Sequence, residues 1–236
     1  LVEHAEIHQG AAVLDIACGR GASLFPASEK VGPSGSVTGI DLSPRMLAAT
    51  QTEIDLRGID NIRLVEMDAE RLLFPSDCFD FALCGLALFF FPHVEQALSE
   101  ILRVLKPQGW FVASTFGEED RRWDIFDELL ETYQGELREV PQADRKKLNS
   151  LSEIAKTLGE AGFTQIEVNT EEKEFHYQDA DEWWSSLWSH GRRALLERMQ
   201  AEALDSFREQ ATKLAQGIRD EKGIPALIQI LITRAR

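Results

Sequence analysis

The sequence predicts an α/β fold in which seven strands form a mostly parallel sheet with helices on both faces. Two observations lead to this prediction. Short apolar segments alternate with segments of helical periodicity along the chain. Several apolar segments end at an acidic residue or a glycine, where a buried parallel strand leaves its sheet. Ligands of such folds bind at the carboxyl ends of the strands, so we expect the functional site there.

The composition fits one globular domain and argues against several classes of partner. The chain has 236 residues, of which 44% are hydrophobic and 28% charged, as in ordinary globular domains. Its formal charge of −15 repels a phosphate backbone or an anionic membrane. No segment approaches the roughly 20 uncharged apolar residues of a membrane span. We therefore expect neither nucleic acid nor a membrane as a partner.

The three cysteines, Cys18, Cys78 and Cys84, indicate a reducing compartment. Their number is odd and no C-x-x-C spacing is present, which argues against a disulfide framework and against a structural zinc site. No charged segment followed by an apolar one marks a signal peptide at the start. We therefore expect a cytoplasmic location.

The first two strands are predicted at 11–17 (AAVLDIA) and 36–42 (SVTGIDL). A helix should follow the second strand, because Ser43 is a suitable N-cap and Pro44 suits the first helical position. Gly58 marks the end of that helix.

The third and fourth strands are predicted at 62–67 (IRLVEM) and 79–85 (FDFALCG). After Val94, apolar residues recur at the spacing of one helical face. These residues are Ala97, Leu98, Ile101, Leu102 and Leu105. The segment 106–109 (KPQG) should end this helix, and the fifth strand is predicted at 110–115 (WFVAST).

The last third of the chain predicts one helix and two strands. Ser150 and Glu153 form a possible capping box for a helix that ends near Gly162. The sixth strand is predicted at 163–169 (FTQIEVN) and the seventh in the last eleven residues (ALIQILITRAR).

Two segments, 118–148 and 175–222, do not follow this alternation and are predicted to be helical insertions after the fifth and sixth strands. Amphipathic aromatic residues are more often core than pocket, but insertions at these positions can cover the carboxyl edge of the sheet. We therefore expect a single domain over 1–236, with a ligand-binding core at about 11–117.

The loop 15–21 (DIACGRG) joins the first strand to a helix. Its glycines allow the backbone to approach a ligand that a Cβ would block. It lacks both the G-x-G-x-x-G pattern of dinucleotide sites and the G-K-[ST] ending of nucleotide-phosphate sites. Asp41 ends the second strand about 20 residues later, where a carboxylate can accept two ribose hydroxyls. Asp68 and Ala69 end the third strand, where they can contact an adenine ring.

Five stretches together resemble the class I S-adenosylmethionine-dependent methyltransferases, in the branch of the ubiquinone and menaquinone biosynthesis methyltransferases (methyltransferase type 11). They cover about residues 11–115 in the family's order. The stretches are VLDIACGRG (13–21), GIDLSPRML (39–47), VEMDAERLLFP (65–75), DFALCGLALFFFPH (80–93) and LSEILRVLKPQGWF (98–111).

This resemblance implies a Rossmann-like fold, S-adenosylmethionine as cofactor, and methyl transfer to an oxygen, nitrogen or carbon of a small-molecule acceptor. The loop around Gly19 would hold the methionine part, Asp41 the ribose, and the backbone of Cys84 would lie by the sulfonium. The cofactor-binding residues that it implies are Asp15, Ala17, Cys18, Gly19, Gly21, Asp41, Leu42, Met46, Asp68, Ala69 and Cys84.

The chain departs from the family pattern at three places. Ala17 stands where the commonest loop has glycine, and we expect this small residue to be tolerated. Phe89 and Phe90 stand where many relatives carry a pair of histidines. Relatives also have a helical segment ahead of the first strand that helps to cover the substrate, and here only about ten residues precede that strand.

Methyl transfer is an in-line displacement that positioning alone can accelerate, so a dedicated base is optional. His93, His176 and His190 are the candidate bases. We expect no metal, because the segment after the fourth strand offers no cluster of carboxylates. An apolar acceptor could contact aromatic residues, and the candidates are Phe89, Phe90, Trp123, Trp184 and Trp188.

Two other functions remain open from the sequence. The first is a protein of the same fold that binds S-adenosylmethionine without methyl transfer, as a scaffold subunit or a non-methylating enzyme. The second is a nicotinamide-dependent oxidoreductase, which the loop disfavours. Binding of S-adenosylhomocysteine rather than NAD would distinguish them.

Overall fold

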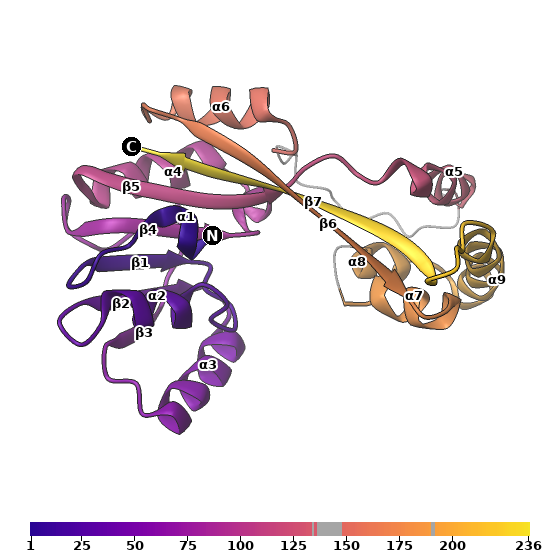
Figure 1. Ribbon diagram of the computed structural model, residues 1–236, viewed down its shortest axis with the longest axis horizontal. Helices are drawn as coiled ribbons and strands as arrows, with labels where there is room; N and C mark the ends of the chain where they lie inside the picture. Colours follow the sequence, from indigo (N-terminus) through magenta and orange to yellow (C-terminus); the bar gives the residue numbers. More distant parts are fainter. Residues whose placement is uncertain (134, 136–147, 190–191) are drawn as a thin grey trace. The chain divides into compact units, whose positions relative to one another are not determined.

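The computed structural model describes residues 1–133, 135, 148–189 and 192–236. Its strands form one sheet of seven in the order β3-β2-β1-β4-β5-β7-β6 (Figure 1). This sheet and its helices confirm the α/β fold. The strands are β1 (Ala12–Ile16), β2 (Ser36–Asp41), β3 (Ile62–Glu66), β4 (Phe79–Gly85), β5 (Leu105–Phe116), β6 (Glu167–Tyr177) and β7 (Ile224–Ala235).

Helices connect most of the strands. The α-helices are α1 (Val2–Ala5), α2 (Leu24–Val31), α3 (Pro44–Arg57), α4 (Val94–Val104), α5 (Asp124–Thr132), α6 (Leu151–Glu160), α7 (Ala180–Leu187), α8 (Arg193–Leu196) and α9 (Ala201–Gly217). The 3-10 helices are η1 (Leu88–Phe90) and η2 (Arg121–Trp123). In the part of the chain that the structure describes, no helix has the length and apolar character to cross a membrane.

The first five strands run parallel, so their carboxyl ends share one edge of the sheet. In β1, Asp15 pairs with Gly39 of β2 on one side and with Leu83 of β4 on the other. β3 pairs in parallel with β2, and β5 with β4. β7 pairs antiparallel with β5. The carboxyl edge of β1 to β5 is therefore the place where loops can converge on a ligand.

The predicted helix caps are confirmed. The Ser43 hydroxyl accepts from the Met46 N–H at 3.3 Å, Pro44 opens α3, and Gly58 ends it with a left-handed φ of 62°. The Ser150 hydroxyl accepts from the Glu153 N–H at 3.3 Å at the start of α6. Local residue chemistry thus sets the ends of both helices.

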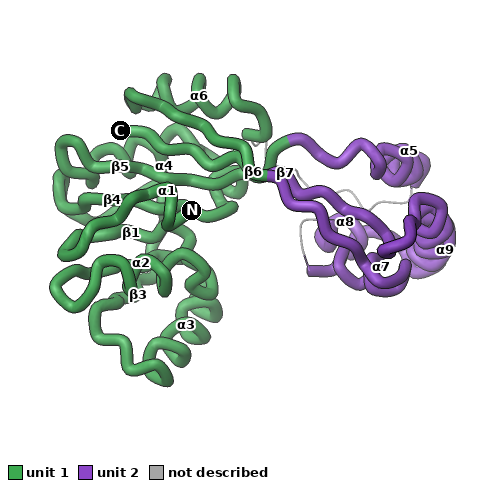
Figure 2. Tube along the Cα trace, in the orientation of Figure 1, with its two compact units in different colours: residues 1–117, 144–171, 230–236 green, residues 118–143, 172–229 purple. Residues whose placement is uncertain are grey.

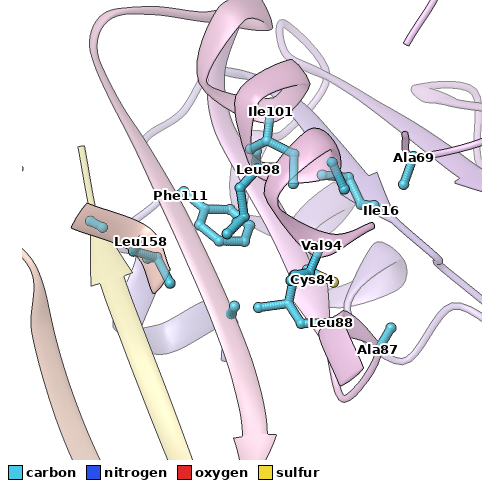
Figure 3. Close-up of a cluster of buried hydrophobic side chains, with 14 of the residues drawn as sticks. Ile16, Ala69, Cys84, Ala87, Leu88, Val94, Leu98, Ile101, Phe111 and Leu158 are labelled. Carbon is cyan, nitrogen blue, oxygen red and sulfur yellow. The ribbon is translucent and has the colours of Figure 1, made fainter. Parts of the chain in front are cut away.

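The sheet is buried on both faces because alternate residues of its central strands point to opposite sides. Leu14 and Ile16 of β1 belong to a cluster that includes residues of α4 and α6 (Figure 3). Val13 of the same strand belongs to a second cluster, which includes residues of α1, α2 and α3. Helices therefore cover both faces, as the apolar segments predicted.

Two strand boundaries differ from those expected. β5 begins at Leu105 rather than at 110, because residues 106–109 form an irregular part of the strand between its pairings with Phe79 and Phe81. β6 occupies Glu167–Tyr177 rather than 163–169. Phe163 is instead a buried core residue, 5.5 Å from the ring of Phe111. Most of β6 is exposed, so no apolar pattern marks its limits.

The described residues divide into two compact units (Figure 2). Unit 1 comprises the described residues within Leu1–Gly117, Asp144–Glu171 and Ile230–Arg236. Unit 2 comprises the described residues within Glu118–Ala143 and Glu172–Gln229. Unit 2 contains helical segments of both predicted insertions and has its own core, in which α5, α7 and α9 contribute Phe126, Trp184 and Phe207. The expectation of a single domain stays a prediction.

Candidate functional site

The loop after β1 is tightly folded by three residues in the left-handed region. Ala17, Gly19 and Gly21 have φ values of 53°, 51° and 83°. A Cβ on Gly21 would lie 2.5 Å from the Phe25 ring, so this position needs glycine. Ala17 occupies the same region at a cost of about 1 kcal/mol. The loop therefore tolerates alanine here, as expected, but at some strain.

Asp41 at the end of β2 ties this loop to helix α3. Its Oδ2 accepts from the Gly19 N–H at 2.9 Å, and its Oδ1 accepts from the Ser43 N–H at 2.8 Å. The Thr50 hydroxyl donates to the Gly19 carbonyl at 2.8 Å and holds the loop from α3. A carboxylate oxygen has two lone pairs, so each Asp41 oxygen can accept one more hydrogen bond. Asp41 is thus suited to accept a pair of hydroxyls.

Asp15 is a buried acid at the base of the same loop. Its side chain is 1% exposed, and its Oδ2 has no hydrogen-bond partner among the described residues. Burial and, secondarily, the charge of Asp41 raise the pKa of Asp15 to about 8. An unpartnered buried carboxyl beneath a glycine-containing loop fits a ligand that brings polar or positive groups, as the amino-acid part of S-adenosylmethionine does.

Residues after β2 and β3 present an apolar surface and a polar edge. Leu42 and Met46 are 66% and 43% exposed, which is unusual for large apolar side chains and fits the flanks of an adenine ring. Asp68 accepts from the Glu70 N–H at 2.9 Å through its Oδ1. Ala69 is buried in the cluster that also contains Ile40. Contacts of these four residues with an adenine ring stay a prediction.

The two buried cysteines near Asp15 are unreactive thiols. Burial and the charge of Asp15 raise the pKa of both Cys18 and Cys84 well above the usual range. The thiolate is the nucleophilic form of cysteine, so neither side chain is a nucleophile at neutral pH. Cys84 lies one residue before the end of β4, within the core (Figure 3), and any contact to a ligand would be through its backbone.

Three phenylalanines gather at the carboxyl ends of β4 and β5. The Phe89 ring lies 4.6 Å from that of Phe90 and 5.7 Å from that of Phe116, measured between ring centroids. Phe90 and Phe116 are 55% and 45% exposed. We call these three residues the phenylalanine patch. Phe116 was not predicted from the sequence, although it ends the strand next to β4 and its position at that strand end is the signal that could have found it.

Two of the three candidate bases are described, and they belong to different units. His93 is an exposed residue of unit 1 that precedes α4, and its backbone N–H donates to Glu70 Oε1 at 2.7 Å. His176 belongs to unit 2, where its Nε2 lies 3.0 Å from Asp220 Oδ2. His190 lies outside the described residues. Their catalytic role stays a prediction.

The predicted tryptophans of the acceptor pocket belong to unit 2 and pack with its core. Trp123 stacks on Trp183 with ring centroids 4.7 Å apart. Trp184 is buried and lies 6.0 Å from Phe207, and Trp188 lies 6.5 Å from Trp184. These side chains have a structural role in unit 2, and a role toward the acceptor stays a prediction.

A cavity of about 860 Å³ opens at the other edge of the sheet, near the amino ends of β2 and β3. Asn61 lines it, but its amide already donates to the Ser28 and Gly32 carbonyls and accepts from the Ser28 hydroxyl. The carboxyl edge, in contrast, holds the unpartnered Asp15, so we assign the site to that edge. Across the described ranges, no group of three or more His, Cys, Asp or Glu is placed to hold a metal ion.

Comparisons with known proteins find methyltransferases among the relatives of this chain. The profile of a family described as a methyltransferase domain matches residues 13–109. Aklanonic acid methyltransferase DauC of Streptomyces sp. (strain C5) is 36% identical over 183 residues, 72% of this chain and 82% of the relative. Demethylmenaquinone methyltransferase of Geobacillus kaustophilus is 31% identical over 182 residues, which are 69% of this chain and 74% of the relative.

A solved structure supports the fold over the whole chain. The YcgJ protein of Bacillus subtilis superimposes with a TM-score of 0.66 at 24% identity, over 100% of this chain and 95% of that protein. At this identity the likeness concerns the fold alone.

Proposed function

This chain belongs to the class I S-adenosylmethionine-dependent methyltransferases and methylates a small molecule, and from this premise we propose that its acceptor is an apolar aromatic compound held against the phenylalanine patch. One observation carries the proposal. Phe89 contacts both Phe90 and Phe116, and all three side chains stay partly exposed at the carboxyl edge of the sheet. Exposed, adjoining aromatic rings favour a flat apolar ligand.

We assign the cofactor contacts to the residues at the carboxyl edge of the sheet. Asp41 accepts the two ribose hydroxyls, because each of its oxygens keeps a free lone pair. Leu42 and Met46 enclose the adenine, and Asp68 and Ala69 contact its edge. The loop of Ala17, Cys18, Gly19 and Gly21, together with Asp15 and the Cys84 backbone, surrounds the methionine part.

When bound, S-adenosylmethionine supplies an electrophilic methyl group on a positively charged sulfur. The chain contributes mainly position: the loop and Asp41 fix the donor side, and the phenylalanine patch orients the acceptor so that the nucleophilic atom approaches in line. Apolar rings also keep water away from the reacting atoms. Positioning of this kind needs no metal.

We propose that proton removal needs no dedicated side chain when the acceptor is an acidic hydroxyl or a carboxyl group, since such a group is already ionised at neutral pH. His93 is the candidate base in unit 1 for a less acidic acceptor. A cytoplasmic location and the absence of a nucleic-acid partner are further parts of the proposal, supported by the charge of −15 and the cysteine pattern.

The test is an acceptor screen with matched pairs. Hydroxylated and carboxylated polycyclic aromatics are compared with aliphatic compounds that carry the same group, and methylated products are measured by mass spectrometry. We expect turnover of aromatics only, and a KM for them that rises about tenfold in Phe90→Ala with the cofactor Kd unchanged. Leu56→Ala, on the exposed side of α3, is the control. Equal turnover of aliphatic partners would contradict the proposal.

A further inference from the structure

The carboxyl group of Asp15 is buried among apolar neighbours. In β1 it lies between Gly39 and Leu83, and by strand alternation it shares a sheet face with Val13. That face carries an apolar cluster to which Leu24 of α2 also belongs. The carboxyl group is therefore buried among groups that cannot solvate a negative charge.

The titratable groups that interact with Asp15 among the described residues are all acidic. Asp41 of β2 raises the pKa of Asp15, and Asp15 in turn raises the pKa of the Cys18 thiol, in the loop after β1, and of the Cys84 thiol in β4. Among the described residues no cationic side chain contributes to the pKa of Asp15. With Oδ2 unpartnered as well, these surroundings favour the protonated, uncharged form of Asp15 in the free protein.

The methyl donor and its product differ by one positive charge. S-Adenosylmethionine carries an ammonium group and a sulfonium, whereas S-adenosylhomocysteine carries the ammonium group and an uncharged thioether. A buried carboxylate interacts far more strongly with such charges than an exposed one does, because little water screens them. A buried carboxyl that ionises when a positively charged ligand binds therefore binds the donor, which has the extra positive charge, more tightly than the product.

We propose that Asp15 releases its proton to solvent as the cofactor binds, and that the resulting carboxylate makes the site prefer the cationic donor over the uncharged-sulfur product. Asp15 is then a specificity-determining residue that strengthens donor binding and weakens product inhibition. After methyl transfer the sulfur is neutral, so Asp15 regains affinity for a proton and the product is held less tightly. This inference rests on the proposed cofactor site.

The experiment is calorimetric titration of the whole protein with S-adenosylmethionine and with S-adenosylhomocysteine, each in phosphate and in Tris. Because these buffers differ in ionisation enthalpy, the difference in heat counts the protons released. At pH 7 we expect nearly one proton per bound donor and less for the product. Between pH 6 and pH 7 the donor affinity should rise by about tenfold, and the preference for donor over product should increase.

Asp15→Asn, which is neutral and of similar shape, should release no proton, bind with an affinity independent of pH in this range, and lose several-fold of the preference for the donor. Asp60→Asn, an exposed loop residue, should behave like the wild type. Binding by the wild type without proton release would overturn the inference while leaving the proposed site intact. Failure of the wild type to bind either ligand would overturn both. If Asp15→Asn does not fold, the proton count of the wild type decides alone.

Discussion

The carboxyl edge of unit 1 and the helical core of unit 2 are both rich in residues that sequence analysis marked, but they hold them in different ways. At the edge of unit 1, Asp41 and Gly19 are joined by a charged hydrogen bond, and Asp15 keeps an unused oxygen. In unit 2, the ring of Trp183 packs against those of Trp123, Trp184 and Phe126. A buried polar atom without a hydrogen-bond partner indicates a ligand site, whereas apolar side chains that pack against one another indicate a core.

The largest effect should come from Trp184 in unit 2. Trp184→Ala removes a buried side chain from the core and should lower the free energy of unfolding by about 3–5 kcal/mol, measured by urea denaturation. Affinity for S-adenosylhomocysteine in the folded variant should stay within twofold. Trp188→Ala, which is only partly buried, should cost less. If Trp184→Ala lost as much affinity for S-adenosylhomocysteine as Asp41→Ala does, the assignment of Trp184 to the core of unit 2 would be contradicted.

Asp15 should make the free protein less stable as pH rises. Its folded-state pKa of about 8 exceeds the ordinary value of 3.8, so its contribution is fully present below pH 3.8 and is lost as pH rises through 8. Asp15→Asn removes this dependence and should be more stable than the wild type at pH 8.5, where the wild-type carboxyl is ionised in a buried place.

Denaturation of both proteins at pH 5, 7 and 8.5 is the measurement, and the difference between them isolates the Asp15 contribution from that of other groups. A difference that does not change with pH would mean that Asp15 is solvated or paired in solution.

Asp41 should carry the next largest effect, on binding. Asp41→Ala removes two charge-assisted acceptors for ribose and the hydrogen bonds to Gly19 and Ser43. We expect the affinity for S-adenosylhomocysteine to fall by about 1.5–3 kcal/mol in calorimetry. Asp55→Ala, on an exposed turn of α3, is the control. An unchanged dissociation constant for Asp41→Ala would remove the site from this edge.

Ala17 should give the smallest effect, and its substitution tests whether the backbone of the loop is strained. Ala17→Gly relieves the left-handed φ of 53° and should raise the free energy of unfolding by about 0.5–1 kcal/mol, partly offset by chain entropy. Ala48→Gly in α3 should lower it by a similar amount, because a helical residue gains nothing from glycine. Thermal denaturation measures both, and the same sign for the two variants would argue against strain at Ala17.

The parts of the fold and site that could be predicted are those in which the deciding interactions are close along the chain. Ser43 caps the helix that begins at the next residue, and Pro44 occupies the first position of that helix. The apolar segments of β1 and β4 are buried on both faces, so composition alone marks them. These features follow from local propensities and from strand ends.

The parts that could not be predicted depend on partners far apart in sequence. β6 is mostly exposed, and its limits are set by its place in the sheet rather than by an apolar pattern. Phe116 joins Phe89 only because β4 and β5 are neighbours. The tryptophans of unit 2 have the same helical spacing whether they face a pocket or a core, so only packing distinguishes the two.

The most direct test of the central claim is hydrogen–deuterium exchange of the wild type with and without S-adenosylhomocysteine. We expect slower exchange in the loop 17–21, at 41–46, and at 68–70, with little change in Ala201–Gly217 of unit 2. Protection that instead appears around 36–38 and 61–63, the lining of the cavity at the opposite edge, would contradict the assignment of the cofactor to the carboxyl ends of the strands.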